Sequence, residues 1–455
     1  MDIGGLNSVQ LCIEDDDAPD AIVKKLTDAK QSKQSKLSFC TAELDDDENV
    51  IRATLDLFRH SSAHGRLWEH LEFSCYGGPI AEIIKEATSL ELFSAISLTE
   101  IFSADGDVND TLLLSIFMAV SAGMKYNSRL EKVQLADLDV SSLHMAALKE
   151  GLKSANSHFK ELTLEDLRFA FVSEDESVSE LEAGLQGNNG LVTLHITACR
   201  LEDEQLTKLT KALVSNSSLR ELSFAENDAG PEVLQALANY LLTNSKLESL
   251  NLSNQIGEHG IVASHIPLLA KGLKCNQYLK VLDLSGNSLD DQSLEDLTRT
   301  VWTCSKLEEL DLTDNNITDE GLQMIASQTL PSSLRCLGLG FNNLTTRGGA
   351  SHLLEILQNN AQLSEVRLGS VEQPSSPEIE HLLDFNQAGR VLLGQGLSVP
   401  LSLWPVVLER ANKMFQYSED DDRERKRANV VFLLLQGPAL MQRRLDRVID
   451  SAKRF

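Results

Sequence analysis

Residues 306–318, KLEELDLTDNNIT, carry two patterns that together decide how this chain folds. Leu310 and Leu312 alternate with acidic residues, which predicts a short strand whose successive side chains face opposite ways. Asn315 ends this strand, and the isoleucine two residues later returns to the interior. The following residues 319–330, DEGLQMIASQTL, change to a spacing near 3.6, which predicts a helix. The stretch is therefore one strand–turn–helix unit.

This unit recurs along most of the chain. We call the middle apolar residue of each expected strand its anchor. The anchors follow one another at intervals of about 30 residues, and such self-similarity is typical of a solenoid. The expected anchors are Val9, Leu37, Leu71, Ile96, Val133, Leu162, Leu194, Leu222, Leu250, Leu282, Leu310, Leu337 and Val366.

Each unit has the same physical logic. The anchor and the residue two positions later are expected to point into the core, and each strand is expected to pair in parallel with its neighbours. Strands lie roughly 4.8 Å apart whereas packed helices need roughly 8–10 Å, so the stack is expected to curve with its strands inside. We therefore predict an α/β horseshoe of about 13 units with parallel strands on the concave face.

The repeat resembles a known family pattern, L-x-x-L-x-L-x-x-N-x-L, which is carried here by Leu307, Leu310, Leu312, Asn315 and Ile317. With its repeat length, it is similar to the leucine-rich repeats of the ribonuclease-inhibitor-like class. That resemblance implies a protein-binding scaffold or inhibitor-like protein without enzymatic activity. It does not identify the partner.

Asparagines recur five residues after several anchors. An amide at this position is expected to bond backbone groups of the turn and link adjacent repeats, so we predict a structural asparagine ladder. Cys199 occupies the same position in its repeat. Helices often end in Asn or Ser, and we expect Asn there in the left-handed conformation that closes a helix. The ladder consists of Asn227, Asn287, Asn315 and Asn342.

The repeats define the expected domain organisation. Residues 1–370 are predicted to form the solenoid, residues 371–376 a Pro/Ser linker, and residues 377–455 a helical cap that covers the apolar end of the stack. The motifs ADGDVND and SEDESVSE read as acidic loops. The last segment also resembles a tail of repeat proteins predicted from single-celled algae, at positions Asn386, Gly389, Arg390, Trp404 and Pro405.

Composition restricts the function classes. The 455 residues carry a formal net charge of −27, which favours basic partners and disfavours nucleic acid and anionic membranes. The N-terminus lacks the pattern of a secretory signal, and the apolar residues 112–124 are too few to span a bilayer, so we expect a cytoplasmic protein. We also expect a monomer. Seven scattered cysteines read as reduced thiols, with Cys12 and Cys40 expected at one register of adjacent repeats.

The outward positions of the strands supply the candidate partner-binding residues. Small polar and acidic side chains dominate there, opposed by Lys36, Lys132 and Arg367, and Asp283, Glu309 and Asp311 form the densest acidic patch. Charge of one sign on a concave face steers a partner of opposite charge, so we predict docking of a basic protein. The candidates are Glu161, Glu165, His195, Glu221, Asn251, Asp283, Glu309, Asp311 and Glu365.

Other chemistries have weaker support. Paired carboxylates need a secluded pocket to act as acid and base, and an open strand face offers none, so no catalytic residue is predicted. His60 and His64, with His70 nearby, lack a further ligand at a convincing spacing, so no metal or cofactor is predicted. No phosphate-binding loop or dinucleotide fingerprint occurs.

The alternative function is a GTPase-activating protein for a Ran-like small GTPase. That family resembles this chain in its repeat type and acidic surface. Its members carry a strongly acidic tail after the repeats, whereas this sequence ends in the basic stretch MQRRLDRVIDSAKRF. A sensor of the innate-immune type would need a nucleotide-binding domain, for which the sequence has no motif.

Overall fold

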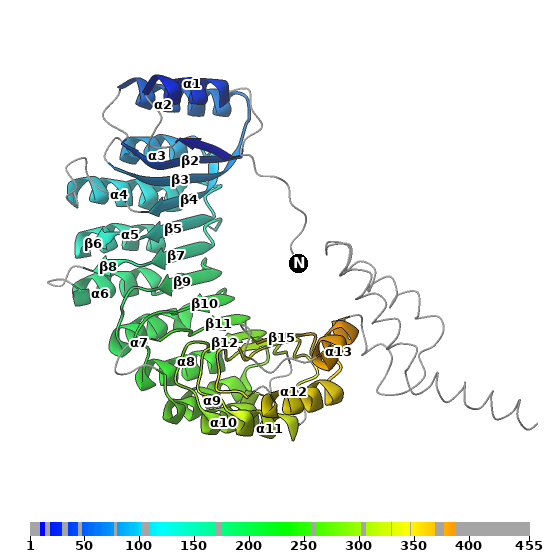
Figure 1. The fold of residues 1–455 in the computed structure, drawn as a ribbon. Coiled ribbons are helices and arrows are strands. Elements are labelled where there is room, and N and C mark those ends of the chain that lie inside the picture. Colours follow the sequence, from blue (N-terminus) through cyan, green and yellow to red (C-terminus); the bar gives the residue numbers. More distant parts are fainter. Residues whose placement is uncertain are drawn as a thin grey trace, which may run out of the picture. The chain divides into compact units, whose positions relative to one another are not determined.

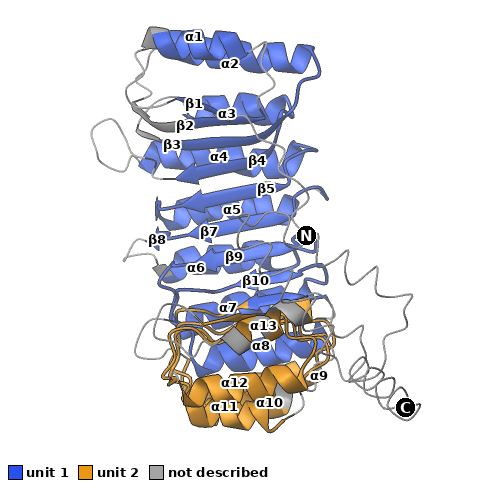
Figure 2. Cartoon of the chain, turned by 45° about the vertical axis from the view of Figure 1, so that its right-hand side comes forward, with its two compact units in different colours: residues 1–250, 255–259 blue, residues 251–254, 260–455 orange. Residues whose placement is uncertain are grey.

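The structure is a computed structural model, and it forms two compact units (Figure 2). Unit 1 comprises Met1–Leu250 and Gln255–His259, and unit 2 comprises Asn251–Asn254 and Gly260–Phe455. The structure describes residues 10–13, 19–29, 35–43, 48–76, 80–99, 101, 110–155, 157–169, 174–244, 246–255, 261–301, 306–328, 330–345, 347–368 and 377–387.

Unit 1 is a parallel sheet with helices stacked along one side (Figure 1). Its strands pair in the order β1-β2-β3-β4-β5-β7-β9-β10, and β6 and β8 form a separate pair. The strands are β1 (Gln10–Ile13), β2 (Lys36–Glu43), β3 (Trp68–Tyr76), β4 (Phe93–Thr99), β5 (Lys132–Ala136), β6 (Asp139–Val140), β7 (Glu161–Glu165), β8 (Arg168–Phe169), β9 (Thr193–Thr197) and β10 (Glu221–Ser223). The helices are α1 (Pro19–Ala29), α2 (Glu48–Ala63), α3 (Ile80–Ser89), α4 (Asp110–Tyr126), α5 (Ser142–Ser154), α6 (Glu174–Leu185), α7 (Asp203–Ala212), the 3-10 turn η1 (Leu213–Ser215) and α8 (Pro231–Thr243).

Unit 2 repeats the same alternation with shorter strands. The chain enters it within β11 (Ser249–Asn251), and β12, β13, β14 and β15 pair in parallel. These strands are β12 (Val281–Asp283), β13 (Glu309–Asp311), β14 (Cys336–Gly338) and β15 (Glu365–Arg367). The helical elements are η2 (Ala263–His265), α9 (Ile266–Cys275), α10 (Asp291–Val301), α11 (Asp319–Ala326), α12 (Gly348–Asn359) and α13 (Pro377–Gln387).

The strand registers pair the anchors within each unit, with one exception. In unit 2, Leu282 lies opposite Leu310, which lies opposite Leu337, and all three are fully buried. In β1 the expected anchor is wrong, because Leu11 rather than the predicted Val9 lies opposite Leu37. Cys12 therefore lies opposite Ser38, so Cys12 and Cys40 do not share a register. A shift of two residues keeps the same face inward, which is why the pattern alone did not reveal it.

The stretch around β13 shows why these residues fold as one unit. Leu310 and Leu312 are buried at 0% and 1% exposure, and Leu322 and Ile325 bury the inner face of the predicted helix. Helix α11 begins after Thr318, whose side chain accepts a hydrogen bond from the Glu320 N–H. This cap satisfies one of the N–H groups that a helix start leaves without an intrahelical partner.

The asparagines five residues after their anchors bond the backbone of two repeats at once. Asn315 Nδ2 donates to the carbonyls of Leu284, Leu312 and Thr313, and its Oδ1 accepts from the Leu289 N–H at 3.0 Å. Asn227, Asn287 and Asn342 donate in the same pattern. In the β11 repeat Gln255 takes this position, where it bonds Phe224 O and the Ala229 N–H.

A second set of asparagines ends the helices, and here the predicted conformation is wrong. Asn216, Asn244 and Asn276 have φ between −82° and −78° with extended ψ, so none is left-handed. Each instead uses its side chain, as when Asn244 Oδ1 accepts from the N–H groups of Lys246 and Leu247. These side-chain bonds cap the start of the next strand, a function for which Asn needs no positive φ.

Most of the left-handed residues lie elsewhere, in the turn four residues after the anchor. Asp137, Asp166, Ala198, Glu226, Asn254, Asp314 and Phe341 have φ between 46° and 58° at this position, and Gly286 has φ 63°. The peptide N–H of most of these residues donates to a carbonyl of the next repeat, as Asp314 N does to Gly340 O at 2.7 Å. The hydrogen bond between repeats therefore offsets the strain of the left-handed conformation in this turn.

One predicted acidic loop is a helix. All of SEDESVSE except its first residue falls in helix α6, where Ser177, Val178 and Leu181 are buried. Acidic residues near a helix start interact favourably with its dipole, and the buried positions follow helical spacing. Of the other motif, ADGDVND, only the last residue, Asp110, is described, and it begins α4.

Helix α13 packs beside α12 and β15. Asn386 Nδ2 donates to Asn360 O at 3.0 Å and to Leu363 O at 2.7 Å, much as Asn244 Nδ2 donates to Asn216 O. The predicted linker, residues 371–376, and the rest of the predicted cap, residues 388–455, lie outside the described residues. Among the helices that are described, none is both long and apolar enough to cross a bilayer.

Candidate partner-binding surface

The candidate surface is the strand face, which we define by the residues one before and one after each anchor. Because the registers pair the anchors, these residues form two rows across the strands of each unit. In unit 2 the first row contains Glu309, Cys336 and Glu365, and the second contains Asp283, Asp311, Gly338 and Arg367. A row of this kind brings together residues that lie about one repeat apart in the sequence.

Unit 1 contains four of the predicted binding residues. Glu161 forms an ion pair with Lys132 of the neighbouring strand, with Nζ and Oε2 2.5 Å apart, so its charge is locally compensated. His195 lies between Thr163 and Ser223 in the second row and is half-buried. Glu165 and Glu221 are exposed.

A chain of hydrogen bonds crosses four strands of unit 1. Ser97 Oγ donates to Gln134 Oε1 at 3.3 Å, and Gln134 Nε2 donates to Glu165 Oε2 at 3.2 Å. The ring nitrogen His70 Nε2 lies 2.7 Å from Ser97 Oγ, so it acts as the donor because the serine proton is directed to Gln134. Burial lowers the pKa of His70, and this effect outweighs the nearby Glu72 carboxylate, which raises the pKa. The lowered pKa favours the neutral ring.

His70 and Gln134 were not among the predicted site residues. Both occupy strand-face positions, His70 one residue before Leu71 and Gln134 one residue after Val133. The position rule that selected the other candidates also covers these two residues, but the selection favoured acidic side chains. This part of the strand face carries cationic, neutral and anionic groups together, so it is not uniformly acidic.

In unit 2 the second row uses its acidic and amide side chains partly for local structure. Asp283 Oδ1 accepts from the N–H of Ser285, and Asp311 Oδ1 accepts from the N–H of Thr313, both at 2.9 Å. Asn251 does the same for Ser253 at 2.8 Å. Each of these side chains therefore has one oxygen fixed by the backbone turn that follows its strand.

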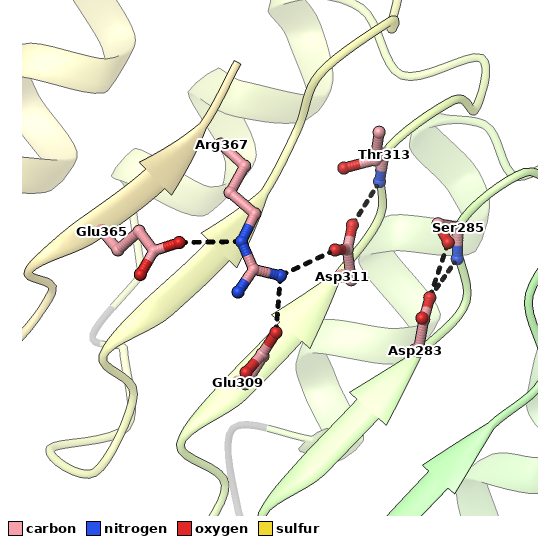
Figure 3. Close-up of polar contacts among 7 residues, drawn as sticks. All are labelled: Asp283, Ser285, Glu309, Asp311, Thr313, Glu365 and Arg367. Atoms are coloured by element: carbon pink, nitrogen blue, oxygen red, sulfur yellow. Dashed lines mark hydrogen bonds and ion pairs between the residues drawn. The ribbon is translucent and has the colours of Figure 1, made fainter. Parts of the chain in front are cut away.

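Arg367 interacts with three of the predicted carboxylates (Figure 3). Its Nη1 donates to Glu309 Oε1 at 2.6 Å and to Asp311 Oδ2 at 3.1 Å, and its Nε donates to Glu365 Oε1 at 2.8 Å. The hydrogen bonds to Glu365 and Glu309 raise the pKa of Arg367 above its usual range. The predicted acidic patch therefore contains its own cation.

Strand β14, which lies between β13 and β15, carries small residues at its outward positions. Gly338 lies between Asp311 and Arg367, and Cys336 lies between Glu309 and Glu365. Cys336 is 6% exposed although it belongs to an outward row, and burial raises the pKa of its thiol to about 12. A neutral, covered thiol of this kind is a poor nucleophile.

The histidines with possible metal-ligand spacing lie in unit 1. The rings of His60 and His64 lie tilted against each other with centroids 4.1 Å apart, and His64 Nδ1 contacts the carbonyl of His60 at 2.8 Å. The part of the chain that is described holds no group of three or more His, Cys, Asp or Glu arranged to bind a metal ion. The side chains that gather on the strand face thus offer hydrogen bonding and charge.

The two units differ in the charge of this face. In strands β12 to β15, Asp283, Glu309, Asp311 and Glu365 face one cation, Arg367, so the described rows of unit 2 carry a net negative charge. In unit 1 the acidic residues share the face with the cations Lys36 and Lys132. On the described strand face, negative charge is therefore concentrated in unit 2.

Comparison with known protein families supports a repeat architecture. A leucine-rich repeat model matches residues 275–297 and 303–326, a span that includes β12, β13 and the first two aspartates of the second row of unit 2. The parallel sheet with one helix per strand is consistent with a leucine-rich repeat protein. No curated protein matches the chain.

Proposed function

We propose that this chain is a non-enzymatic protein-binding scaffold and that the strand face of unit 2 docks a basic segment of a protein partner. Leucine-rich repeats generally mediate protein–protein interactions, and the family match lies on the strands that carry Asp283, Glu309 and Asp311. The observation that carries the proposal is the excess of carboxylates over cations in this part of the face. Such an excess attracts a basic partner and orients it.

The geometry favours moderate affinity. Glu309 and Asp311 have side chains 29% and 14% exposed, so a cation that reaches them is partly desolvated. Partly buried ion pairs are screened less by salt than exposed ones. However, the rows of unit 2 contain no aromatic side chain in the described strands β12 to β15, and aromatic residues usually anchor tight interfaces.

The test removes charge from the face without changing its shape. In the double variant Asp283→Asn/Asp311→Asn, each amide oxygen can still accept from the N–H of Ser285 or Thr313. We expect about tenfold weaker binding of a fluorescent oligo-arginine peptide, measured by anisotropy at low salt, because two charge contacts of up to about 1 kcal/mol each are lost.

The matched control removes two charges from the helix layer. Glu320 on α11 and Glu355 on α12 are exposed, so Glu320→Gln/Glu355→Gln changes the net charge by the same amount. We expect this control to weaken binding by less than about twofold, as a purely long-range effect screened by salt would. Equal losses in both double variants, or no peptide binding to the unmodified protein, would contradict the proposed docking face.

A further inference from the structure

Arg367 extends from the last described strand of unit 2 across β14 to β13. Its guanidinium group contacts Glu365 on its own strand and Glu309 and Asp311 two strands away (Figure 3). The side chain is 43% exposed, so it lies over the strand face rather than within the core. The side chain thus links three carboxylates that lie on two different strands.

Gly338 keeps the space between β13 and β15 free of a side chain. A Cβ at this position would lie 2.1 Å from Asp311 Oδ1 and 2.8 Å from Thr313 Oγ1, closer than real Cβ atoms approach. Any larger residue would therefore displace the Asp311 carboxylate from its present place. The absence of a side chain at Gly338 allows Asp311 to take the position in which it accepts from Arg367.

Arg367 contacts the same oxygen atoms that the proposed function offers to a partner. Glu309 Oε1 and Asp311 Oδ2 both accept from its Nη1, while Asp311 Oδ1 accepts from the Thr313 N–H. A guanidinium group from a partner would bind carboxylate oxygens in the same way, because the geometry of its planar N–H donors fits a carboxylate. A second cation at this position has to share these oxygens or displace Arg367.

We propose that Arg367 is an internal competitor that occupies the Glu309–Asp311 pair until an arginine of the partner displaces it. This inference rests on the proposed function and adds the regulation of that same surface. Displacement is possible because the Arg367 side chain is partly exposed and its ion pairs join flexible side chains. The incoming arginine re-forms the ion pairs that Arg367 gives up, so the exchange has a small net cost. Arg367 thus lowers the affinity for any basic segment and discriminates against weakly basic ones.

The test replaces Arg367 by glutamine. Arg367→Gln removes the competing cation but keeps a polar side chain, and we expect oligo-arginine peptide to bind about three- to tenfold more tightly, by anisotropy at low salt. The control Arg299→Gln removes the same charge from the Arg299–Glu295 ion pair on helix α10. We expect less than about a twofold gain for this control, because it changes only the long-range field.

The outcomes separate this inference from the proposed function. If the peptide binds the unmodified protein through Asp283 and Asp311 but Arg367→Gln leaves affinity unchanged or lowers it, Arg367 is not a competitor, although the docking face stands. If neither protein binds the peptide, both proposals are overturned. Equal gains for Arg367→Gln and Arg299→Gln would also overturn the competitor role, since net charge alone would then explain them. Thermal unfolding of each variant verifies that the fold is retained.

Discussion

The turn after β7 in unit 1 and the turn after β13 in unit 2 occupy the same position of the repeat pattern. They differ in the interactions that hold the turn. After β13, Asn315 bonds the turn through its amide and is 5% exposed. After β7 the equivalent position holds Leu167, which is 1% exposed and offers no hydrogen bond through its side chain. Here the chain forms the extra strand pair β6–β8, in which Asp139 lies opposite Arg168.

In unit 1, ion pairs of Arg168 with two aspartates accompany the β6–β8 strand pair. Arg168 Nε donates to Asp139 Oδ1 at 2.7 Å, and its Nη1 also contacts Asp137 Oδ1. The hydrogen bonds to Asp139 and Asp137 raise the pKa of Arg168 above its usual range. The comparison shows that the repeat requires satisfied backbone groups in this turn, and that either a buried amide or additional backbone pairing with surface charges can provide them.

The largest expected effect is at Asn315. Asn315→Ala removes the donor to three carbonyls and the acceptor for the Leu289 N–H, all in a buried turn. We expect the free energy of unfolding to fall by about 2–3 kcal/mol, because buried backbone groups lose their partners. Urea unfolding measures the loss, and faster hydrogen exchange of the Leu289 amide locates it.

The substitution Asn315→Leu sharpens the same comparison. It inserts the residue that follows β7 at this position, but after β13 the described chain has the isolated parallel bridge between Thr318 and Asn343 in place of a strand pair of the β6–β8 type. We therefore expect Asn315→Leu to be at least as destabilising as Asn315→Ala. A protein with unchanged stability would mean that the leucine alone closes the turn, which breaks the comparison.

A smaller effect is expected at Arg168. Arg168→Met removes both ion pairs but keeps the apolar stem, and the side chain is 36% exposed, so solvent screens the interaction. We expect a loss of about 1 kcal/mol at low salt. The loss should shrink at about 0.5 M salt, because salt screens surface charges. An Asn315→Ala loss that shrank equally would show that the two turns do not differ in mechanism.

The smallest effect concerns Cys199, which stands between the two kinds of turn. Its thiol takes the asparagine position and donates to Thr197 O at 3.2 Å. Burial raises its pKa to about 12, so the reactive thiolate is scarce until the pH approaches that value. We expect alkylation of native Cys199 by iodoacetamide to remain slow between about pH 7 and pH 9, where an ordinary thiol becomes much more reactive.

Mass spectrometry after timed labelling measures the modification of Cys199, with urea-unfolded protein as the control. Rapid labelling of native protein at the lower pH would show that this turn opens readily. Labelling limited by unfolding would make Cys199 a probe of the boundary between the two types of repeat.

Much of the fold was predictable because its signals are local. The alternation at Leu310 and Leu312 and the asparagine that follows lie within six residues of one another. The helix-end residues Asn216 and Asn244 were recognised as terminators, but their conformation was not. Asparagine favours both left-handed turns and side-chain capping, and only the observed backbone distinguishes them.

The candidate site was less predictable, because its contacts depend on register and on side-chain reach. Arg367 was visible as a cation opposing the acidic residues. Its contacts with Glu309 and Asp311 depend on two strands being separated by one that carries Gly338, and they join residues 58 and 56 positions apart in the sequence. Charge counting by position assigns each side chain separately and cannot show which carboxylates are already paired.

The positive φ angles at the fourth position after the anchors have an engineering consequence. Left-handed backbone costs an ordinary L-residue roughly 1 kcal/mol, a penalty that glycine largely avoids. Phe341 has φ 54° and is 58% exposed, whereas glycine already occupies the equivalent position at Gly286 in the β12 repeat. Substituting glycine for such a residue, one turn at a time, would raise the thermal stability without altering the strand face.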